Sequence, residues 1–332
     1  MGRSANIPVL NSLRAVAALS VCLFHFICTV TGFITNAQVL KVFSYGHYGV
    51  QMFFVISGFI IPWSMYYGGY RLQNFFLFTA KRLIRLEPPY LFSLFVAIMH
   101  TYLRTLSPHY NGVDITPSLR QVLLHFGYLV PFFHGETWIR PVYWTLAIEF
   151  QYYITIGLLF HFISSRRIVL RLVFYALFLS GPILLKANFL PFHLPVFLLG
   201  IILYLYKTEI ISLLEMWIVA VLAFIVIAFF NDLSTVFFGG FAFLSILYFE
   251  DFKSKIGNFF GEISYSIYLF HSLTGMIILN YFAHTVHSPV VKLAILLVAI
   301  LASVICSYGV FRLIEKPSKR FSSRIKYNKS KE

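Results

Sequence analysis

The chain has 332 residues, of which 59% are hydrophobic and only 11% are charged, and its mean hydropathy is +0.80. Soluble domains carry about 25% charged residues, so this composition excludes the soluble globular, disordered and fibrous classes. The net charge of +14 does not require a nucleic-acid partner, because the basic excess falls in loops on one predicted side of a membrane. The three cysteines, Cys22, Cys28 and Cys306, lie in apolar runs and make no disulfide or zinc framework.

Ten apolar stretches follow one another along the chain, and each approaches the roughly 20 residues that a helix needs to cross the hydrocarbon core. The sequence therefore predicts an all-α integral membrane protein of about ten transmembrane helices, in a single transmembrane domain over residues 1–332. In chain order the stretches lie at 9–31, 49–67, 87–106, 142–163, 168–185, 191–206, 214–231, 234–249, 259–283 and 290–311.

Basic residues are distributed unevenly between the two sides of this predicted membrane. With a cytoplasmic N-terminus, 20 of the 26 Lys and Arg fall on the inner side and 6 on the outer side. The asymmetry satisfies the positive-inside rule, so we expect both termini to be cytoplasmic, with a basic cytoplasmic tail at about 312–332. One long outer segment, 107–141, contains the apolar run Val122–Phe133, which is too short to cross and is expected to be interfacial or re-entrant.

Several polar side chains fall deep in the predicted spans, where ionisable groups usually mark function. Arg14 and His25 are eleven residues apart, so on a helix they share one face and lie roughly 16 Å apart along its axis. Glu149 is predicted at the depth of His25, where a carboxylate would fix the imidazole tautomer and raise its basicity. A structural polar pair between helices is the alternative. Ser57 falls at a similar depth, and His271 falls near mid-membrane.

A predicted cytoplasmic loop at 81–88 carries two further arginines. Arg82 and Arg85 are three residues apart and share a face if the loop is helical, which would make a phosphate site. Their other interpretation is a topology signal. Together with Arg14, they could hold a polyanion at the inner surface while a reacting atom lies roughly 16 Å further out, near His25. A nucleotide that carries a long, thin arm fits this arrangement, and coenzyme A is the obvious candidate.

Six short segments of the chain, in order, resemble the acyltransferase 3 family of polytopic membrane acyltransferases. They are Leu13–Arg14 with His25, Gly49–Phe59, Arg82–Pro88, Trp144–Tyr153, Gly261–His271 and Glu315–Pro317. The resemblance implies transfer of an acyl group from cytoplasmic acyl-CoA to an extracytoplasmic hydroxyl, commonly on a sugar. It also implies that the Arg14-to-His25 spacing serves donor use and that His25 is the essential histidine.

These observations lead to one preferred functional hypothesis. We expect a multi-pass O-acyltransferase of the bacterial inner membrane, with acetyl as the acyl group and a surface polysaccharide or its lipid-linked precursor as acceptor. Acyl-CoA is a co-substrate, with no permanently bound cofactor and no metal, because no ligand cluster has the required spacing. The alternative is a transporter or exporter of an anionic solute with a His25–Glu149 proton relay.

Within that hypothesis each residue has a predicted role. His25 is the general base that takes the proton of the acceptor hydroxyl. Glu149 orients the His25 ring and favours its protonated form. Arg14, Arg82 and Arg85 bind the donor phosphates. Direct transfer and a covalent acyl-His25 intermediate both remain open. Candidates for oxyanion or acceptor contacts are Ser57, His271, Trp144 and Tyr153.

Overall fold

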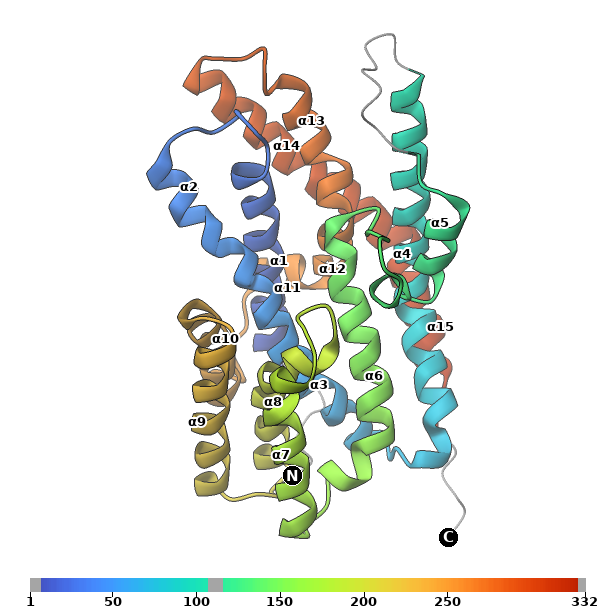
Figure 1. The fold of residues 1–332 in the computed structure, drawn as a ribbon, viewed down its shortest axis with the longest axis vertical. Helices are drawn as coiled ribbons and strands as arrows, with labels where there is room; N and C mark the ends of the chain where they lie inside the picture. The colour runs from blue at the N-terminus through green and yellow to red at the C-terminus, as the bar shows by residue number, and fades with distance from the viewer. Residues whose placement is uncertain (1–6, 107–115, 328–332) are drawn as a thin grey trace.

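The computed structural model describes residues 7–106 and 116–327, and within these ranges the chain folds into helices without strands. Figure 1 shows the helices as a bundle whose long axis is vertical, with α14 crossing diagonally behind the others. The helices are α1 (Val9–Cys28), α2 (Ala37–Ser44), α3 (Gly49–Tyr67), α4 (Phe75–Thr105), α5 (Leu119–Phe126), α6 (Trp144–Ile163), α7 (Ile168–Leu184), α8 (Leu190–Lys207), α9 (Leu213–Phe230), α10 (Leu233–Tyr248), α11 (Lys255–Glu262), α12 (Ser264–Phe270), α13 (Gly275–Phe282), α14 (Pro289–Val310) and α15 (Lys316–Arg324).

Six segments of the described chain are long and apolar enough to cross a membrane, which makes this a multi-pass membrane protein. They are Val9–Cys28, Ala37–Tyr67, Pro141–Ile163, Leu190–Lys207, Leu213–Phe230 and Pro289–Arg324. The helices α7 and α10 are apolar but shorter. The count of ten spans and the cytoplasmic placement of the termini remain predictions.

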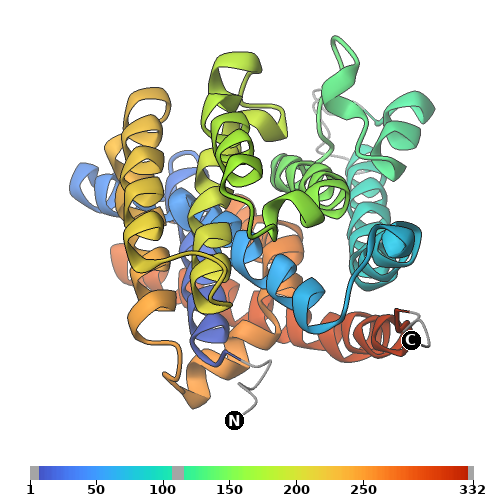
Figure 2. The same ribbon diagram turned by 90° about the horizontal axis from the view of Figure 1, so that it is seen from below.

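The apolar residues of the bundle face both inward and outward. Helix α8 is buried on nearly all sides, whereas α9 and α14 expose large apolar side chains such as Phe229 and Ile305. Seen from below in Figure 2, α9 and α10 (gold) lie on one side of the bundle and α4 (cyan) on the opposite side. Small residues let α3 and α8 touch, because a Cβ on Gly58 would collide with the Phe197 carbonyl and one on Gly200 with the Val55 carbonyl.

Two predicted segments differ from the structure. Residues 81–88 are not a loop, because α4 runs without interruption from Phe75 to Thr105, with Pro88 and Pro89 inside it. The predicted span 259–283 is not one helix, because it divides into α11, α12, a 3-10 turn at His271–Leu273 and α13. At the break the Ser303 hydroxyl accepts from the Gly275 amide at 3.0 Å, which satisfies a backbone group freed by the interruption.

The predicted outer segment 107–141 folds back along α4, although its residues 107–115 lie outside the described residues. Its apolar run forms α5 and a 3-10 turn, Val130–Phe132. Tyr90 on α4 donates to the carbonyl of His125 at 3.1 Å, and the Tyr128 hydroxyl donates to Glu87 at 2.7 Å. The segment therefore packs against a helix of the bundle.

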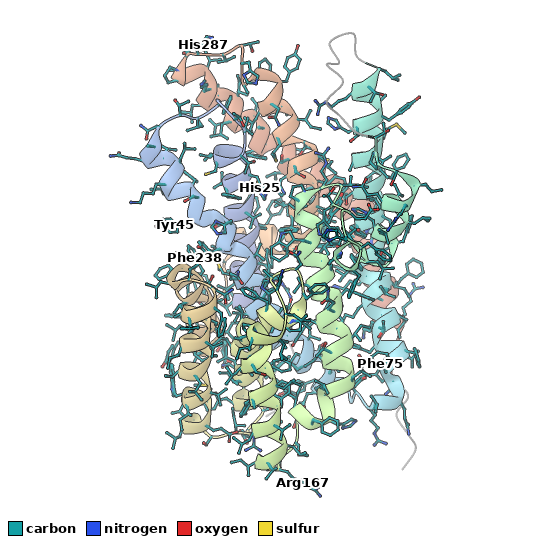
Figure 3. All side chains as sticks on the ribbon, in the orientation of Figure 1. His25, Tyr45, Phe75, Arg167, Phe238 and His287 are labelled. Carbon is teal, nitrogen blue, oxygen red and sulfur yellow. The ribbon has the colours of Figure 1, made fainter. Side chains whose placement is uncertain are left out.

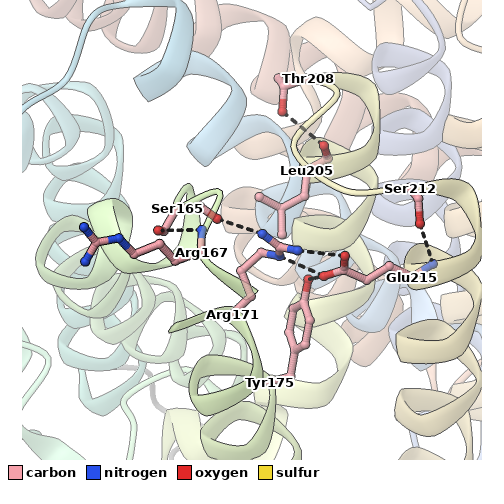
Figure 4. Close-up of polar contacts among 8 residues, drawn as sticks. All are labelled: Ser165, Arg167, Arg171, Tyr175, Leu205, Thr208, Ser212 and Glu215. Atoms are coloured by element: carbon pink, nitrogen blue, oxygen red, sulfur yellow. Dashed lines mark hydrogen bonds and ion pairs between the residues drawn. The ribbon is translucent and has the colours of Figure 1, made fainter. Parts of the chain in front are cut away.

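One ion pair joins α7 and α9 at the end of the bundle that also holds Arg167 (Figures 3 and 4). Arg171 contacts Glu215 through Nε and Nη2, both at 2.8 Å, and Tyr175 donates to the same carboxylate at 3.0 Å. Such a two-point contact between a guanidinium and a carboxylate fixes geometry as well as charge. Arg171 is thus a structural residue in addition to one of the basic residues that predict topology.

Candidate active site

A cavity of about 170 Å³ opens among α1, α3, α4, α6, α12 and the C-terminal helix α15. The cavity coincides with the predicted site, because six of the nine predicted site residues line it. These six are Arg14, Ser57, Arg82, Arg85, Glu149 and Tyr153. The other three, His25, His271 and Trp144, lie beyond its walls.

Cations from three different helices meet at this cavity. Arg14 comes from α1, Arg82 and Arg85 come from one face of α4, and Lys319 comes from α15. Arg82 donates to the Ser64 hydroxyl at 2.8 Å and lies over the Tyr153 ring at 5.7 Å. Within the described ranges, no carboxylate forms an ion pair with Arg14, Arg82 or Arg85. Guanidinium groups without a carboxylate partner are suited to binding an anion.

Glu149 also faces the cavity, but its partner is not the predicted one. The Ser57 hydroxyl on α3 donates to Glu149 Oε1 at 2.9 Å, and Tyr153 follows Glu149 by one helical turn on α6. The expected hydrogen bond between Glu149 and His25 is not formed in the structure. The reason is the stagger of the helices, because α6 begins lower in the bundle than α1 ends (Figure 1).

His25 on α1 is paired instead with the buried His271, which begins the 3-10 turn after α12. Figure 3 marks the position of His25. His271 Nε2 lies 3.2 Å from His25 Nδ1, and the Val21 carbonyl lies 2.9 Å from the same nitrogen. His271 Nδ1 lies 2.9 Å from the Ile267 carbonyl.

These partners determine the tautomers of the two neutral rings. A carbonyl oxygen can only accept, so the Nδ1 atom of each ring carries the proton. His271 Nε2 is then an acceptor for the proton on His25 Nδ1. The Nε2 atom of His25 is left with a free lone pair, which is what a general base needs.

Tyr268 lies between the histidine pair and the cavity. Its hydroxyl shares a hydrogen bond with Thr145 at 2.7 Å, and both residues line the cavity. Its ring centre lies 6.3 Å from that of His271 and 6.0 Å from that of Phe53. Because α1 is one continuous helix, Arg14 and His25 are separated by roughly 16 Å along its axis, as expected.

Trp144 has a packing role in the structure. Its ring centre lies 6.3 Å from that of Phe54 and 5.6 Å from that of His193. Sequence reasoning gave no role to Tyr268, Thr145, Glu315 or Lys319, although all four line the cavity. Three of the six motif segments contain Thr145, Tyr268 and Glu315, and that signal could have drawn attention to these residues.

A family model described as an acyltransferase domain matches residues 7–312. The chain belongs to the acyltransferase 3 family. It is therefore an enzyme that transfers acyl groups. The family resemblance of the six sequence segments is confirmed. No solved structure matches the chain.

Curated relatives of this acyltransferase come from Staphylococcus aureus. The O-acetyltransferase OatA of strain NCTC 8325 / PS 47 is 28% identical over 199 residues, which cover 55% of this chain and 30% of the relative. OatA of strain COL matches with the same figures. The match thus spans less than a third of the length of these relatives.

Proposed function

We propose that this protein is an O-acetyltransferase of the bacterial inner membrane. It takes an acetyl group from cytoplasmic acetyl-CoA and transfers it to a hydroxyl of an extracytoplasmic acceptor, a surface polysaccharide or its lipid-linked precursor. The observation that carries the proposal is the convergence of Arg14, Arg82 and Arg85 on one cavity. No carboxylate of the described residues forms an ion pair with any of the three. The similarity to an O-acetyltransferase over about half of the chain supports the choice of acyl group and of a hydroxyl acceptor.

In this proposal the donor lies along α1. The phosphates of CoA bind the three arginines, and the pantetheine arm extends toward His25, roughly 16 Å outward from Arg14. Phosphate oxygens accept from the guanidinium groups in two-point contacts, which fix the nucleotide at the inner end. The thioester then lies near the outer end of α1, where an extracytoplasmic hydroxyl can meet it.

The reaction is one of general base catalysis. His25 Nε2 takes the proton of the acceptor hydroxyl while the hydroxyl oxygen attacks the thioester carbonyl carbon. The tetrahedral intermediate collapses, the C–S bond breaks, and the CoA sulfur receives the proton from His25. The products are the acetyl ester and free CoA, and no step needs a metal. His271 takes the orienting role that the sequence assigned to Glu149, while Glu149 and Ser57 lie beside the donor route.

Steady-state kinetics with acetyl-CoA test this function. Purified protein in detergent should release free CoA from acetyl-CoA when an acceptor glycan is present, which a transporter would not do. Arg82→Ala and Arg85→Ala should each raise the KM for acetyl-CoA about tenfold or more, since a hydrogen bond to a charged group contributes about 1.5–3 kcal/mol. Lysine at either position should restore binding only in part, because it lacks the two-point contact.

Controls separate donor binding from other effects of removing arginine. Arg167→Ala removes an exposed arginine that immediately precedes α7 and does not line the cavity, and it should leave the KM unchanged. Arg82→Ala should also lower the melting temperature, because Arg82 is buried and bonded to Ser64, whereas Arg85→Ala should not. If both alanine variants keep the wild-type KM, these arginines are topology signals only.

A further inference from the structure

Two residues after position 312 line the cation end of the cavity: Glu315, which belongs to the motif segment Glu315–Pro317, and Lys319, which lies outside the six segments. The match ends at residue 312, and the chain continues as a π-helical turn, Phe311–Glu315, and then as α15. Glu315 and Lys319 from this continuation line the cavity together with Arg14 and Arg85. We propose that Lys319 is a fourth phosphate-binding cation of the donor site and that Glu315 is its displaceable counter-ion. This inference rests on the function proposed above.

The C-terminal helix is fixed in place and is not a free tail. The Ser322 hydroxyl donates to the carbonyl of Lys81 at 2.8 Å, and the Lys81 ammonium donates to the carbonyl of Ile325 at 3.3 Å. Beyond α15, the ring of Tyr327 packs edge-on against that of Tyr70, with ring centres 5.6 Å apart. These contacts attach α15 to α4 and to the turn between α3 and α4. The predicted basic tail at about 312–332 is therefore part of the bundle up to residue 327, and its last residues, 328–332, lie outside the described residues.

Glu315 is held more firmly than Lys319. Its side chain is fully buried, and its Oε2 accepts from the Ser266 hydroxyl on α12 at 2.6 Å. Its Oε1 lies 2.6 Å from the Lys319 ammonium, whose side chain is 32% exposed. The same ammonium donates to the carbonyl of Glu262 at 3.2 Å. The flexible four-carbon side chain of Lys319 therefore presents its ammonium group to the cavity, while the backbone of α15 is held in place.

The charges of the cavity explain why the ion pair would open for a donor. The lining contains four cations, Arg14, Arg82, Arg85 and Lys319, and two carboxylates, Glu149 and Glu315. The site is thus net positive, as a phosphate site should be, and Glu315 reduces that charge while the site is empty. A phosphate oxygen near Lys319 replaces one Glu315 oxygen as its partner, while Glu315 keeps the hydrogen bond from Ser266. Lys319 then pairs with the phosphate, while Glu315 keeps the Ser266 hydrogen bond at Oε2 and loses its ammonium partner at Oε1. The negative charge of the bound phosphates, shared among the four cations, offsets the cost of opening this buried pair.

Steady-state kinetics with two donors test this assignment. Lys319→Ala should raise the KM for acetyl-CoA about tenfold, while leaving the KM for S-acetylpantetheine, which has the thioester and arm but no phosphate, unchanged. Lys319→Met retains most of the apolar stem and should behave in the same way, which excludes lost packing as the cause. Arg320→Ala is the matched control, because it removes an equal charge from the neighbouring, exposed position of α15. The KM difference between Lys319→Ala and wild type should also shrink as salt is raised.

Removing the charge of the counter-ion Glu315 should change donor binding in the opposite direction from removing Lys319. Glu315→Gln keeps the shape and the acceptor for Ser266 but removes the negative charge, so acetyl-CoA should bind as tightly as in the wild type or more tightly. A tenfold weaker binding in Glu315→Gln would contradict a displaceable counter-ion. An unchanged KM in Lys319→Ala, with raised KM values in Arg82→Ala and Arg85→Ala, would overturn this inference and leave the proposed function standing. Unchanged KM values in all three variants would overturn both.

Discussion

His271 Nε2 lies 3.2 Å from His25 Nδ1, although 246 residues separate the two along the chain. The contact gives His25 a partner of a different chemical kind from the predicted carboxylate. A neutral imidazole orients the ring and fixes its tautomer, but it contributes no negative charge to stabilise an imidazolium. The Val21 carbonyl and His271 Nε2 both accept from His25 Nδ1, so Nε2 is the unprotonated, basic nitrogen of the neutral ring.

Replacing His271 should lower the rate without changing donor binding. His271→Leu removes one of the two acceptors for the His25 Nδ1 proton and leaves only the Val21 carbonyl. Misorientation of a catalytic group can cost about 10²-fold in kcat. His271→Gln keeps an acceptor oxygen and should recover a large part of that loss. Both variants should keep the wild-type KM for acetyl-CoA, since His271 does not line the cavity. Equal rates for Leu and Gln at this position would show that His271 only fills space.

Ser57 and Glu149 should act as one unit. Ser57→Ala removes the donor of the 2.9 Å hydrogen bond, and Glu149→Gln removes the negative charge of its acceptor. The two changes alter the same contact, so their effects on kcat/KM should depart from additivity by roughly 0.5–3 kcal/mol. The matched comparison is Glu149→Gln with His271→Gln, which share no partner in the structure and should add within about 0.5 kcal/mol. A strong coupling in the second pair would restore the original prediction that Glu149 works through the catalytic histidine.

The folded outer segment should loosen as the pH falls. His125 Nδ1 lies 2.7 Å from the Gln121 carbonyl, so it carries the proton, and Nε2 accepts from the Ile139 amide at 3.1 Å. Burial lowers the pKa of His125 below its ordinary 6.5. A lowered folded pKa means that the stabilising effect is complete above the unfolded pKa and is lost as the pH falls below about 6.5.

Hydrogen exchange measures this effect directly. The protection factor of the Ile139 amide, corrected for intrinsic exchange, should fall between pH 7.5 and pH 5.5, because protonated Nε2 no longer accepts. His125→Gln retains an acceptor that does not titrate, so its protection should be independent of pH in this interval. Equal pH dependence in both proteins would exclude His125 as the titrating group.

Cysteine labelling can establish the orientation of the bundle. Arg167 and His287 are exposed and lie at opposite ends of the molecule (Figure 3). In a variant without Cys22, Cys28 and Cys306, a cysteine at position 167 should react only from the cytoplasm and one at position 287 only from outside. Labelling of both from the same side would overturn the membrane placement on which the donor route depends.

Much of the helical pattern could be predicted from the sequence, because apolar segment length is a local property. The first predicted span, 9–31, corresponds to α1, and the predicted span 214–231 corresponds to α9. The run Val122–Phe133 likewise forms α5 and a 3-10 turn, not a span. The sequence predicts that Arg14, Arg82 and Arg85 act together, and they line one cavity, although α4 and not a loop carries Arg82 and Arg85.

The partners of the catalytic residues were less predictable. The depth of Glu149 was counted from the outer end of its own helix, which assumes that helices begin at one level. The stagger between α1 and α6 breaks that assumption and comes from packing among segments far apart in sequence. The break at His271–Leu273 also depends on a distant side chain, Ser303, which no local pattern in 259–283 reveals.

The division of residues 259–283 bears on how the protein is inserted during synthesis. Helices α12 and α13 contain only 7 and 8 residues, which is about 12 Å each, against a hydrocarbon core of about 30 Å. Neither piece can enter the bilayer as an independent helix. Gly275 lies so close to Phe26 and Ser303 that a Cβ would collide with both, so α13 fits only between α1 and α14. We therefore expect α13 to reach its final position only after α14 has been synthesised, and the His25–His271 pair to form late in biogenesis.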